Sequence, residues 1–445
     1  MATPALGAPR HVLARGPVQR YSDAVMNIGL IPFFSALHPD FSVQGTHAEL
    51  FEALSEHHTV VLATPDDWRT RDLDLVVVFV ASGGTEGQFV EAFPKLPRPV
   101  YLLTDGKHNS LAASLEISAW TREQGVSSEI LHGGPELVVR RIDAIAAVER
   151  ALTRIRGMNI GFVGKPSDWL VASSIDRAAV GEALGVRFED VPLEELYEWI
   201  DAASDDEAAA VARETADASG GCVEPTAEAI HEAARIYVGL RDLVRESDLS
   251  ALSLRCFDLI GRYNNTGCLA LARLNDEGIV AGCEGDQQAL LSVLLSQELT
   301  GEVPFLANPA GIDVESNEID FAHCMIPTKV VDSFKLRSHF ESGVGVAIEG
   351  AMPDGPVTVV RLGRGDLSLG WYSEGELIGR GDRADRCRTQ ASLRLDRSVR
   401  YFLENPVANH HVVVPGRWGA RFAELFHRLG VAFAEAQAPA GAGAR

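Results

Sequence analysis

Short β-rich runs alternate with helix-like stretches through the first third of the chain, and this alternation restricts the possible folds more than any other feature. The apolar runs 58–64, 72–84 and 98–106 are each followed by a turn and a helix-like segment. Repeated units of this kind favour a parallel sheet with helices on both of its faces. The sequence therefore predicts a doubly wound α/β domain at the N-terminus.

A chain of 445 residues is too long for one ordinary hydrophobic core, so several domains are expected. Changes in the pattern of strand-like and helix-like runs indicate where these domains begin and end. A helical stretch ends at Gly157, where a new strand-like run begins and further α/β units follow. Beyond about residue 300, short β runs separated by glycine and proline predict an antiparallel, barrel-like domain. We predict two Rossmann-like α/β domains at 1–156 and 157–280, a C-terminal antiparallel β-barrel-like domain at 281–435, and a disordered tail at 436–445.

The composition indicates a globular protein that does not bind polyanions. Apolar residues make up 46% of the chain and charged residues 23%, as in soluble folded proteins. The 62 acidic and 40 basic residues give a formal charge of -22, which repels nucleic acids and anionic membranes. The N-terminus lacks the apolar region of a signal peptide, and no apolar run is long enough to span a membrane. We therefore expect a cytoplasmic protein without nucleic-acid or membrane partners.

The cysteines give no sign of a zinc ribbon or of a disulfide framework. None of them forms a C-x-x-C pair, and they are widely spaced along the chain. We therefore expect reduced and mostly buried thiols at all six positions: Cys222, Cys256, Cys268, Cys283, Cys324 and Cys387.

Two carboxylates, Glu284 and Asp286, form the densest polar cluster in an apolar context. They lie between a strand-like run and a helix-like run, and Asp258 follows another apolar strand in the same way. Carboxylates at such a junction can cap the helix and favour its first turn. Alternatively, all three side chains lie at the carboxyl edge of one sheet, where they could converge on a hard cation. Both interpretations stay open on the residues alone.

A metal site of this kind needs a further ligand, for which an imidazole is a frequent choice. His410 and His411 precede an apolar strand, so one of the two should point inward if the strand alternates. His323 and His339 lie in strand-like contexts, where a histidine is more often an ordinary core or surface residue.

Two loops of the first domain also follow predicted strands. The loops are 82–87, which contains Ser82 and Thr85, and 105–110. Both should lie at the carboxyl edge of the sheet, where open α/β folds bind ligands. Their glycines could equally serve only to make tight turns, and neither loop matches a dinucleotide-binding or P-loop pattern.

Several motifs in order resemble the L-fucose isomerase family and its L-arabinose isomerase relatives. These are the run from Cys256 to Gly301, the ANP and AHC segments, SHFESGVG and the late ANHH, which together cover about residues 250–430. The N-terminal half is similar mainly in its two-domain layout and in the segments SGGTEG and NSLAASLEI. In this family two carboxylates and a histidine bind a divalent metal, usually Mn²⁺. The resemblance implies a metal-dependent sugar isomerase.

The resemblance also implies roles for individual residues. Glu284 and Asp286 match the family's carboxylate-bearing turn, His410 matches its late histidine, and Asp258 lies near its first carboxylate, which is a Glu there. The arabinose branch has a further histidine near Gly311 that this chain lacks, which favours the fucose-like arrangement. The predicted metal ligands are Asp258, Glu284, Asp286 and His410, the predicted proton-transfer groups are Asp258, Glu284 and Asp286, and the predicted substrate-binding residues are Ser82, Thr85, His323, His339 and His411.

The implied reaction is an aldose–ketose isomerisation, in which a proton moves between C1 and C2 through a cis-enediol. A metal-dependent epimerase or retro-aldol enzyme for an unusual or anionic sugar shares this chemistry and stays open. A sugar-binding or regulatory homologue without catalysis is the alternative of another class. Family members are homo-oligomers, so the resemblance implies a trimer or hexamer in which a neighbour's N-terminal domain completes the pocket.

Overall fold

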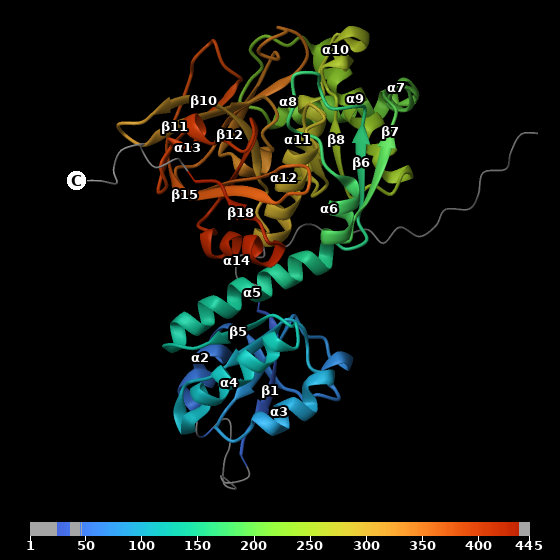
Figure 1. Cartoon of the computed structure of the whole chain (residues 1–445). Helices are drawn as coiled ribbons and strands as arrows, with labels where there is room; N and C mark the ends of the chain where they lie inside the picture. The colour runs from blue at the N-terminus through green and yellow to red at the C-terminus, as the bar shows by residue number, and fades with distance from the viewer. Residues whose placement is uncertain (1–24, 36–44, 46, 436–445) are drawn as a thin grey trace, which may run out of the picture.

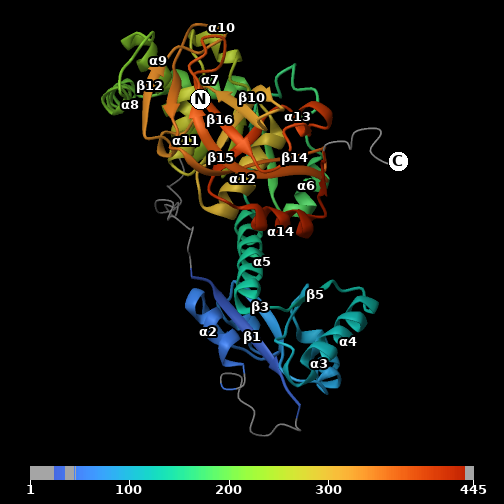
Figure 2. The same cartoon turned by 90° about the vertical axis from the view of Figure 1, so that its left-hand side faces the viewer.

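The computed structural model describes residues 25–35, 45 and 47–435, so the predicted tail at 436–445 lies outside the described residues. Figures 1 and 2 show the long helix α5 (Pro135–Ile155) between the N-terminal domain and the larger body formed by the rest of the described chain. Within the described ranges, no helix combines the length and the hydrophobicity that a membrane crossing requires.

The N-terminal domain is built on a five-stranded parallel sheet with the strand order β2-β1-β3-β4-β5. Alternate residues of β3 enter two different hydrophobic clusters, Val77 and Phe79 in one, Val76 and Val78 in the other. Burial on both faces is what helices on both sides of a parallel sheet produce. The elements are β1 (Asn27–Phe33), α2 (Ala48–His57), β2 (Thr59–Leu62), β3 (Leu75–Val80), α3 (Glu86–Ala92), β4 (Val100–Leu103), α4 (Ser110–Glu123) and β5 (Ser128–Leu131).

The central domain contains a second parallel sheet, of four strands in the order β7-β6-β8-β9. Helix α12 is buried along almost its whole length, because it contacts β8 and β9 of this sheet and also β14 and β17 of the C-terminal domain. The elements are β6 (Asn159–Val163), α6 (Arg177–Leu184), β7 (Arg187–Val191), α7 (Leu193–Ala202), α8 (Asp205–Ala218), α9 (Ala227–Glu246), β8 (Ala251–Leu254), α10 (Asp258–Tyr263), α11 (Cys268–Asp276), β9 (Val280–Gly282) and α12 (Gln287–Thr300).

The C-terminal domain is a closed antiparallel barrel of six strands in the order β14-β17-β10-β11-β16-β15, with β15 pairing again with β14. Closure removes the free edges of the sheet. A short strand, β18, adds to β15 in parallel. The elements are β10 (Phe305–Asp313), β11 (Glu318–His323), β12 (Ser333–Arg337), β13 (Ala347–Ala351), β14 (Gly355–Gly363), β15 (Leu369–Arg380), β16 (Thr389–Leu395), α13 (Tyr401–Glu404), β17 (His411–Pro415), α14 (Gly419–Leu429) and β18 (Ala432–Phe433).

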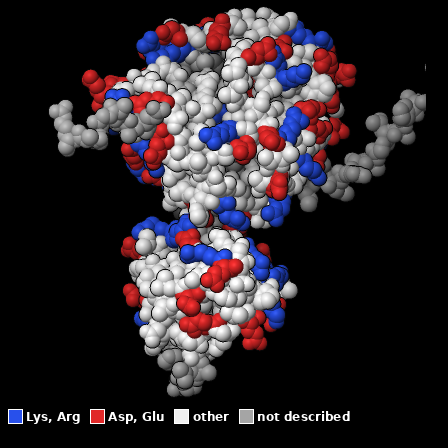
Figure 3. All heavy atoms as spheres, in the orientation of Figure 1, with Lys and Arg blue, Asp and Glu red and all other residues white. Residues whose placement is uncertain are grey.

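This architecture confirms the predicted fold class of two parallel-sheet α/β domains followed by an antiparallel barrel. The strand β9 belongs to the central sheet, and the first barrel strand, β10, begins at Phe305. On the face drawn in Figure 3, acidic and basic side chains of the described residues are interspersed, without an extended basic patch.

Candidate active site

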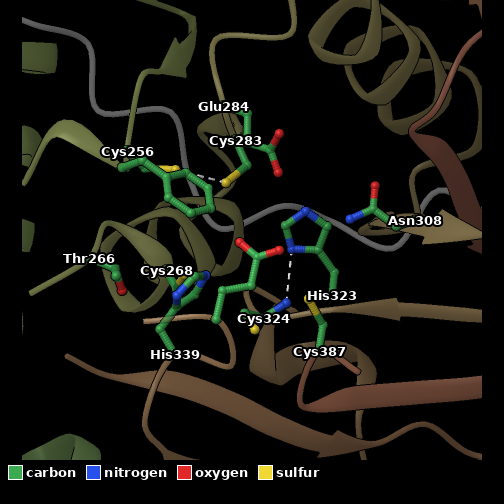
Figure 4. A pocket seen from close by; sticks show the side chains of 12 residues that line it. Cys256, Thr266, Cys268, Cys283, Glu284, Asn308, His323, Cys324, His339 and Cys387 are labelled. Carbon is green, nitrogen blue, oxygen red and sulfur yellow. Dashed lines mark hydrogen bonds between the residues drawn. The ribbon is translucent and has the colours of Figure 1, made fainter. Parts of the chain in front are cut away.

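The turn that joins β9 to α12 has a strained backbone. Glu284 and Gly285 both adopt left-handed conformations, with φ of 60° and 72°. A side chain at Gly285 is excluded, because a Cβ there would lie 2.8 Å from the carbonyl oxygen of Lys165. The Glu284 carbonyl accepts a hydrogen bond from the Ser167 amide (2.9 Å). These contacts fix the turn and leave the Glu284 side chain directed into a buried pocket, as Figure 4 shows.

Asp286 caps helix α12 and forms a fully buried ion pair. Its Oδ1 accepts a hydrogen bond from the Ala289 amide (2.7 Å) and lies 3.2 Å from Nη2 of Arg361. Its Oδ2 lies 2.9 Å from Nδ1 of His410. Burial alone would raise the pKa of Asp286, but Arg361 and His410 outweigh burial and hold this pKa well below its ordinary value. Asp286 is therefore an anion that orients His410.

His410 lies between the two carboxylates of the turn. Because Nδ1 donates its hydrogen to Asp286, Nε2 points toward Oε1 of Glu284 at 3.6 Å. This Nε2 is buried and has no hydrogen-bond partner in the described chain. Burial lowers the pKa of His410, yet the two carboxylates outweigh burial and raise it to about 9. Without another cation, His410 is thus protonated at neutral pH.

The pKa of His410 predicts how stability depends on pH. The unfolded histidine has a pKa near 6.5 and the folded one about 9, so between these values the folded protein binds more protons. The free energy of unfolding of the metal-free protein should fall by up to about 3 kcal/mol as the pH rises through this window. Urea denaturation at pH 6.5 and pH 9.5 measures the change, and His410→Gln should remove most of it. An equal fall in His410→Gln would contradict the assignment.

Glu284 is held by a second partner besides His410. The indole N–H of Trp169 donates a hydrogen bond to Oε2 of Glu284 (2.6 Å). Burial would raise the pKa of Glu284, but its interaction with His410 outweighs burial and lowers it to about 2. Glu284 is therefore a fixed anion at neutral pH.

His323 differs from His410 in the nitrogen that it offers to the pocket. The amide N–H of Cys324 donates to Nδ1 of His323 (2.8 Å), so the hydrogen of the neutral ring lies on Nε2. This Nε2 is buried without a hydrogen-bond partner among the described residues. Burial lowers the pKa of His323 to about 3, which keeps the ring neutral. His323 is therefore suited to donate a hydrogen bond to a ligand oxygen.

The pocket is formed where the carboxyl edge of the central sheet meets the barrel. Cys256 and Glu284 come from the ends of β8 and β9, and His323 comes from the end of β11 (Figure 4). His339 also lines it, with Nδ1 hydrogen-bonded to the Ser342 hydroxyl (3.0 Å). The lining residues are Cys256, Phe257, Thr266, Cys268, Cys283, Glu284, Asn308, His323, Cys324, His339, Glu341 and Cys387.

The remaining predicted residues lie elsewhere. Asp258 begins α10, is 39% exposed and pairs with Arg255 (3.0 Å) in a different hollow, because the chain turns after Cys256. His411 is buried, with its Nε2 3.0 Å from the Tyr401 hydroxyl. The structure therefore does not bring Asp258 or His411 to the pocket that Glu284 lines.

The predicted residues of the N-terminal domain have local roles in this chain. Ser82 accepts a hydrogen bond from the Ser35 amide (2.8 Å), and the Thr85 hydroxyl donates to the Ser82 carbonyl (3.0 Å). Both side chains are fully buried. These bonds stabilise the loop after β3, in a domain that lies on the other side of α5 from the barrel (Figure 1).

Sequence reasoning overlooked three side chains that support or line the pocket: Arg361, Trp169 and Glu341. Arg361 stands in the otherwise apolar run GPVTVVRLG, and a charged residue within such a strand is a signal for a buried ion pair. Nothing comparable in the sequence distinguishes the other two residues. The hydrogen bond of Trp169 joins it to Glu284 from a distant segment, and Glu341 reaches the pocket only through the fold.

No family model matches the chain. It is similar to sulfoquinovose isomerase of Clostridium sp. (strain MSTE9), with 27% identity over 241 residues, 52% of this chain and 54% of the relative. It is also similar to the sulfoquinovose isomerases of Alkalicoccus urumqiensis (24% over 265 residues, 57% and 59%) and Priestia aryabhattai (24% over 242 residues, 51% of each). The chain thus spans about half the length of the curated relatives it matches. These names support the coarser expectation of a sugar isomerase.

Proposed function

We propose that this chain is an aldose–ketose isomerase for a monosaccharide, and that the sugar carries a sulfonate group, as in the sulfoquinovose that the relatives' names contain. One observation carries the proposal. The carboxylate of Glu284 lines one pocket together with His323 and lies 3.6 Å from Nε2 of His410, which is buried behind it; in the described chain neither this Nε2 nor that of His323 has a hydrogen-bond partner. An enediol-forming reaction requires a charged group that is held in place, here Glu284, and a neutral group that donates a hydrogen bond, here His323.

The residues present fit a divalent cation between Glu284, at the wall of the pocket, and His410. The Nδ1 of His410 is bound by Asp286, which leaves an electron pair on Nε2 whenever the ring is neutral. A carboxylate behind a histidine in this way is the common support of metal-binding histidines. Glu284 and His410 would hold Mn²⁺ or a similar ion, whereas both oxygens of Asp286 are occupied by Arg361, Ala289 and His410. Such an ion would supply positive charge to the sugar oxygens on which negative charge develops.

The chain's own residues account for the rest of the reaction. His323 donates its Nε2 hydrogen to a sugar oxygen, because that nitrogen has no other partner in the described chain. Glu341 lines the pocket and forms no hydrogen bond or ion pair with any other described residue. We assign to Glu341 the transfer of the proton between C1 and C2, since a carboxylate free of strong partners can accept and return a proton. Glu284 is less suited to this step because its pKa is lowered to about 2.

Proton exchange with solvent tests this function directly. The protein is incubated with Mn²⁺ and either sulfoquinovose or a panel of unmodified aldoses in D₂O, and deuterium at C2 is followed by NMR. We expect exchange together with formation of the ketose, and loss of both in Glu341→Gln. Asp258→Asn is the matched control, because that carboxylate lies outside the pocket. Epimer or cleavage products would instead favour the other enediol reactions, and binding without exchange would favour a non-catalytic sugar-binding protein.

We further propose that the active form is a homo-oligomer, a trimer or hexamer, in which the N-terminal domain of a neighbour covers the pocket. The position of that domain supports the proposal, because it projects from the larger body on the other side of α5 (Figure 2). The loops around Ser82 and Thr85 would then act on a second copy.

A further inference from the structure

The pocket itself offers no basic side chain to an anionic sugar. Of the described residues that line it, none is a lysine or an arginine, whereas Glu284 and Glu341 are carboxylates. Burying an anion such as a sulfonate is costly unless a cation pairs with it. In sulfoquinovose the sulfonate is attached to C6, at the other end of the carbon chain from C1 and C2. A basic residue beside the pocket, away from Glu284, is therefore needed to bind it.

Arg388 is a partly buried arginine without an acidic partner. Its Nε donates to the Ser338 carbonyl (2.8 Å) and its Nη2 to the Ser338 hydroxyl (3.1 Å). Ser338 thus occupies one edge of the guanidinium, and the edge formed by Nη1 and the second hydrogen of Nη2 has no partner among the residues that the structure describes. The carboxylate of Glu224, which also accepts from the Ser338 amide, is bound through both oxygens by Arg337 (2.7 and 2.8 Å).

Other arginines that are partly or fully buried do pair with a carboxylate. In a chain with a formal charge of -22, acidic partners are plentiful, so a guanidinium kept apart from them stands out. Its free edge can donate two parallel hydrogen bonds to the oxygens of one anionic group. The arginines with a carboxylate partner include Arg150, Arg241, Arg255, Arg273, Arg337, Arg361 and Arg386.

Arg388 lies next to the side of the pocket that is opposite Glu284. Ser338, which holds the guanidinium, directly precedes His339, and Cys387 directly precedes Arg388. His339 and Cys387 line the pocket across from Glu284, as Figure 4 shows. Burial lowers the pKa of His339, Glu284 opposes this shift and Arg388 adds to it. His339 is therefore within electrostatic reach of both charged groups, and the pocket extends from one toward the other.

We propose that Arg388 binds the sulfonate of the sugar and determines the preference of this site for a sulfonated over a neutral substrate. This inference deepens the function proposed above and rests on it. With C1 and C2 of the open-chain sugar near Glu284, the sulfonate at the other end of the chain meets the free edge of Arg388. Because Ser338 already holds the guanidinium, little side-chain freedom is lost on binding.

Two ligands that differ only in the sulfonate test this role without turnover. They are the alditols obtained by reducing sulfoquinovose and 6-deoxyglucose, which are open-chain and cannot isomerise. Calorimetric titration of the full-length protein with Mn²⁺ gives the Kd of each. The parent should bind the sulfonated alditol more tightly, and Arg388→Met should weaken this binding by about 10- to 100-fold while changing the Kd of the neutral alditol by less than about 2-fold.

Two further variants separate charge from geometry and from general effects. Arg388→Lys keeps the charge but loses the planar fork, so its loss should be intermediate. Arg383→Met is the matched control and should bind both alditols as the parent does, because this arginine is 58% exposed and pairs with Asp385. Circular dichroism confirms that each variant is folded.

Three results would overturn the proposal: a parent that binds neither alditol, a parent that binds both equally, or an Arg388→Met variant that weakens both equally, as a purely structural arginine would. Isomerisation is measured separately. A parent that prefers the sulfonated alditol through Arg388 yet isomerises no sugar would refute the proposed function and leave the sulfonate site standing. A parent that isomerises neutral aldoses and binds both alditols equally would do the reverse.

Discussion

Glu284→Gln should lower kcat/KM for aldose–ketose isomerisation by more than about 1000-fold, which corresponds to about 4 kcal/mol of lost transition-state stabilisation. The substitution removes the negative charge that faces His410 Nε2 at 3.6 Å. It keeps the size of the side chain, and the amide oxygen can still accept the hydrogen bond from Trp169. The expected loss is therefore a loss of charge at the proposed cation site and not of the fold. Steady-state kinetics at saturating Mn²⁺ measure it.

Asp258→Asn is the matched control for this substitution. It also neutralises a carboxylate that was predicted as a metal ligand, but this carboxylate is 39% exposed and pairs with Arg255. Its kcat/KM should stay within about 2-fold of the parent, since exposed ion pairs contribute little. An Asp258→Asn variant as inactive as Glu284→Gln would contradict a site that excludes Asp258 and would show that this carboxylate takes part in the reaction. Substantial activity in Glu284→Gln would exclude Glu284 as an essential group.

The sequence predicted the fold class because each domain has its own local pattern. The apolar run that became β3 is buried on both faces, as a continuous hydrophobic strand between two helix layers must be. Glycine and proline between the later β runs indicated antiparallel strands. Closure of the barrel depends on the pairing of β14 with β15 and on the order of all six strands, which are long-range contacts that no local pattern contains.

The candidate site was predictable in part, for a related reason. Glu284 and Asp286 are two residues apart, and a strand-to-helix turn brings both to the sheet edge. Their side chains nevertheless diverge, because the left-handed backbone at Glu284 sends its carboxylate into the pocket while Asp286 turns back to cap α12. Asp258 and Cys256 separate in the same way, since α10 begins between the pocket and the outer hollow. Side-chain direction after a strand depends on φ and ψ values that residue types do not fix.

Arg361→Met should destabilise the protein by about 3–5 kcal/mol, because it leaves the buried carboxylate of Asp286 without its strongest compensating charge. Both side chains are fully buried, and Nη2 of Arg361 lies 3.2 Å from Oδ1 of Asp286. Urea denaturation at neutral pH measures the change in the free energy of unfolding. Arg394→Met is the matched control, since this arginine of the same barrel is 59% exposed in its ion pair with Glu318. It should cost no more than about 1 kcal/mol.

The double variant Arg361→Met/Asp286→Asn separates charge compensation from packing. If the uncompensated carboxylate causes the loss, removing its charge should restore more than half of the stability that Arg361→Met removes. If the volume of the arginine matters instead, the double variant stays as unstable as the single one, and the role assigned to the ion pair is wrong. Restored stability should not restore isomerisation, because the Asp286→Asn substitution takes away the anion that fixes the Nδ1 hydrogen of His410. A stable but inactive double variant would show that Arg361 stabilises the fold whereas Asp286 also orients the site.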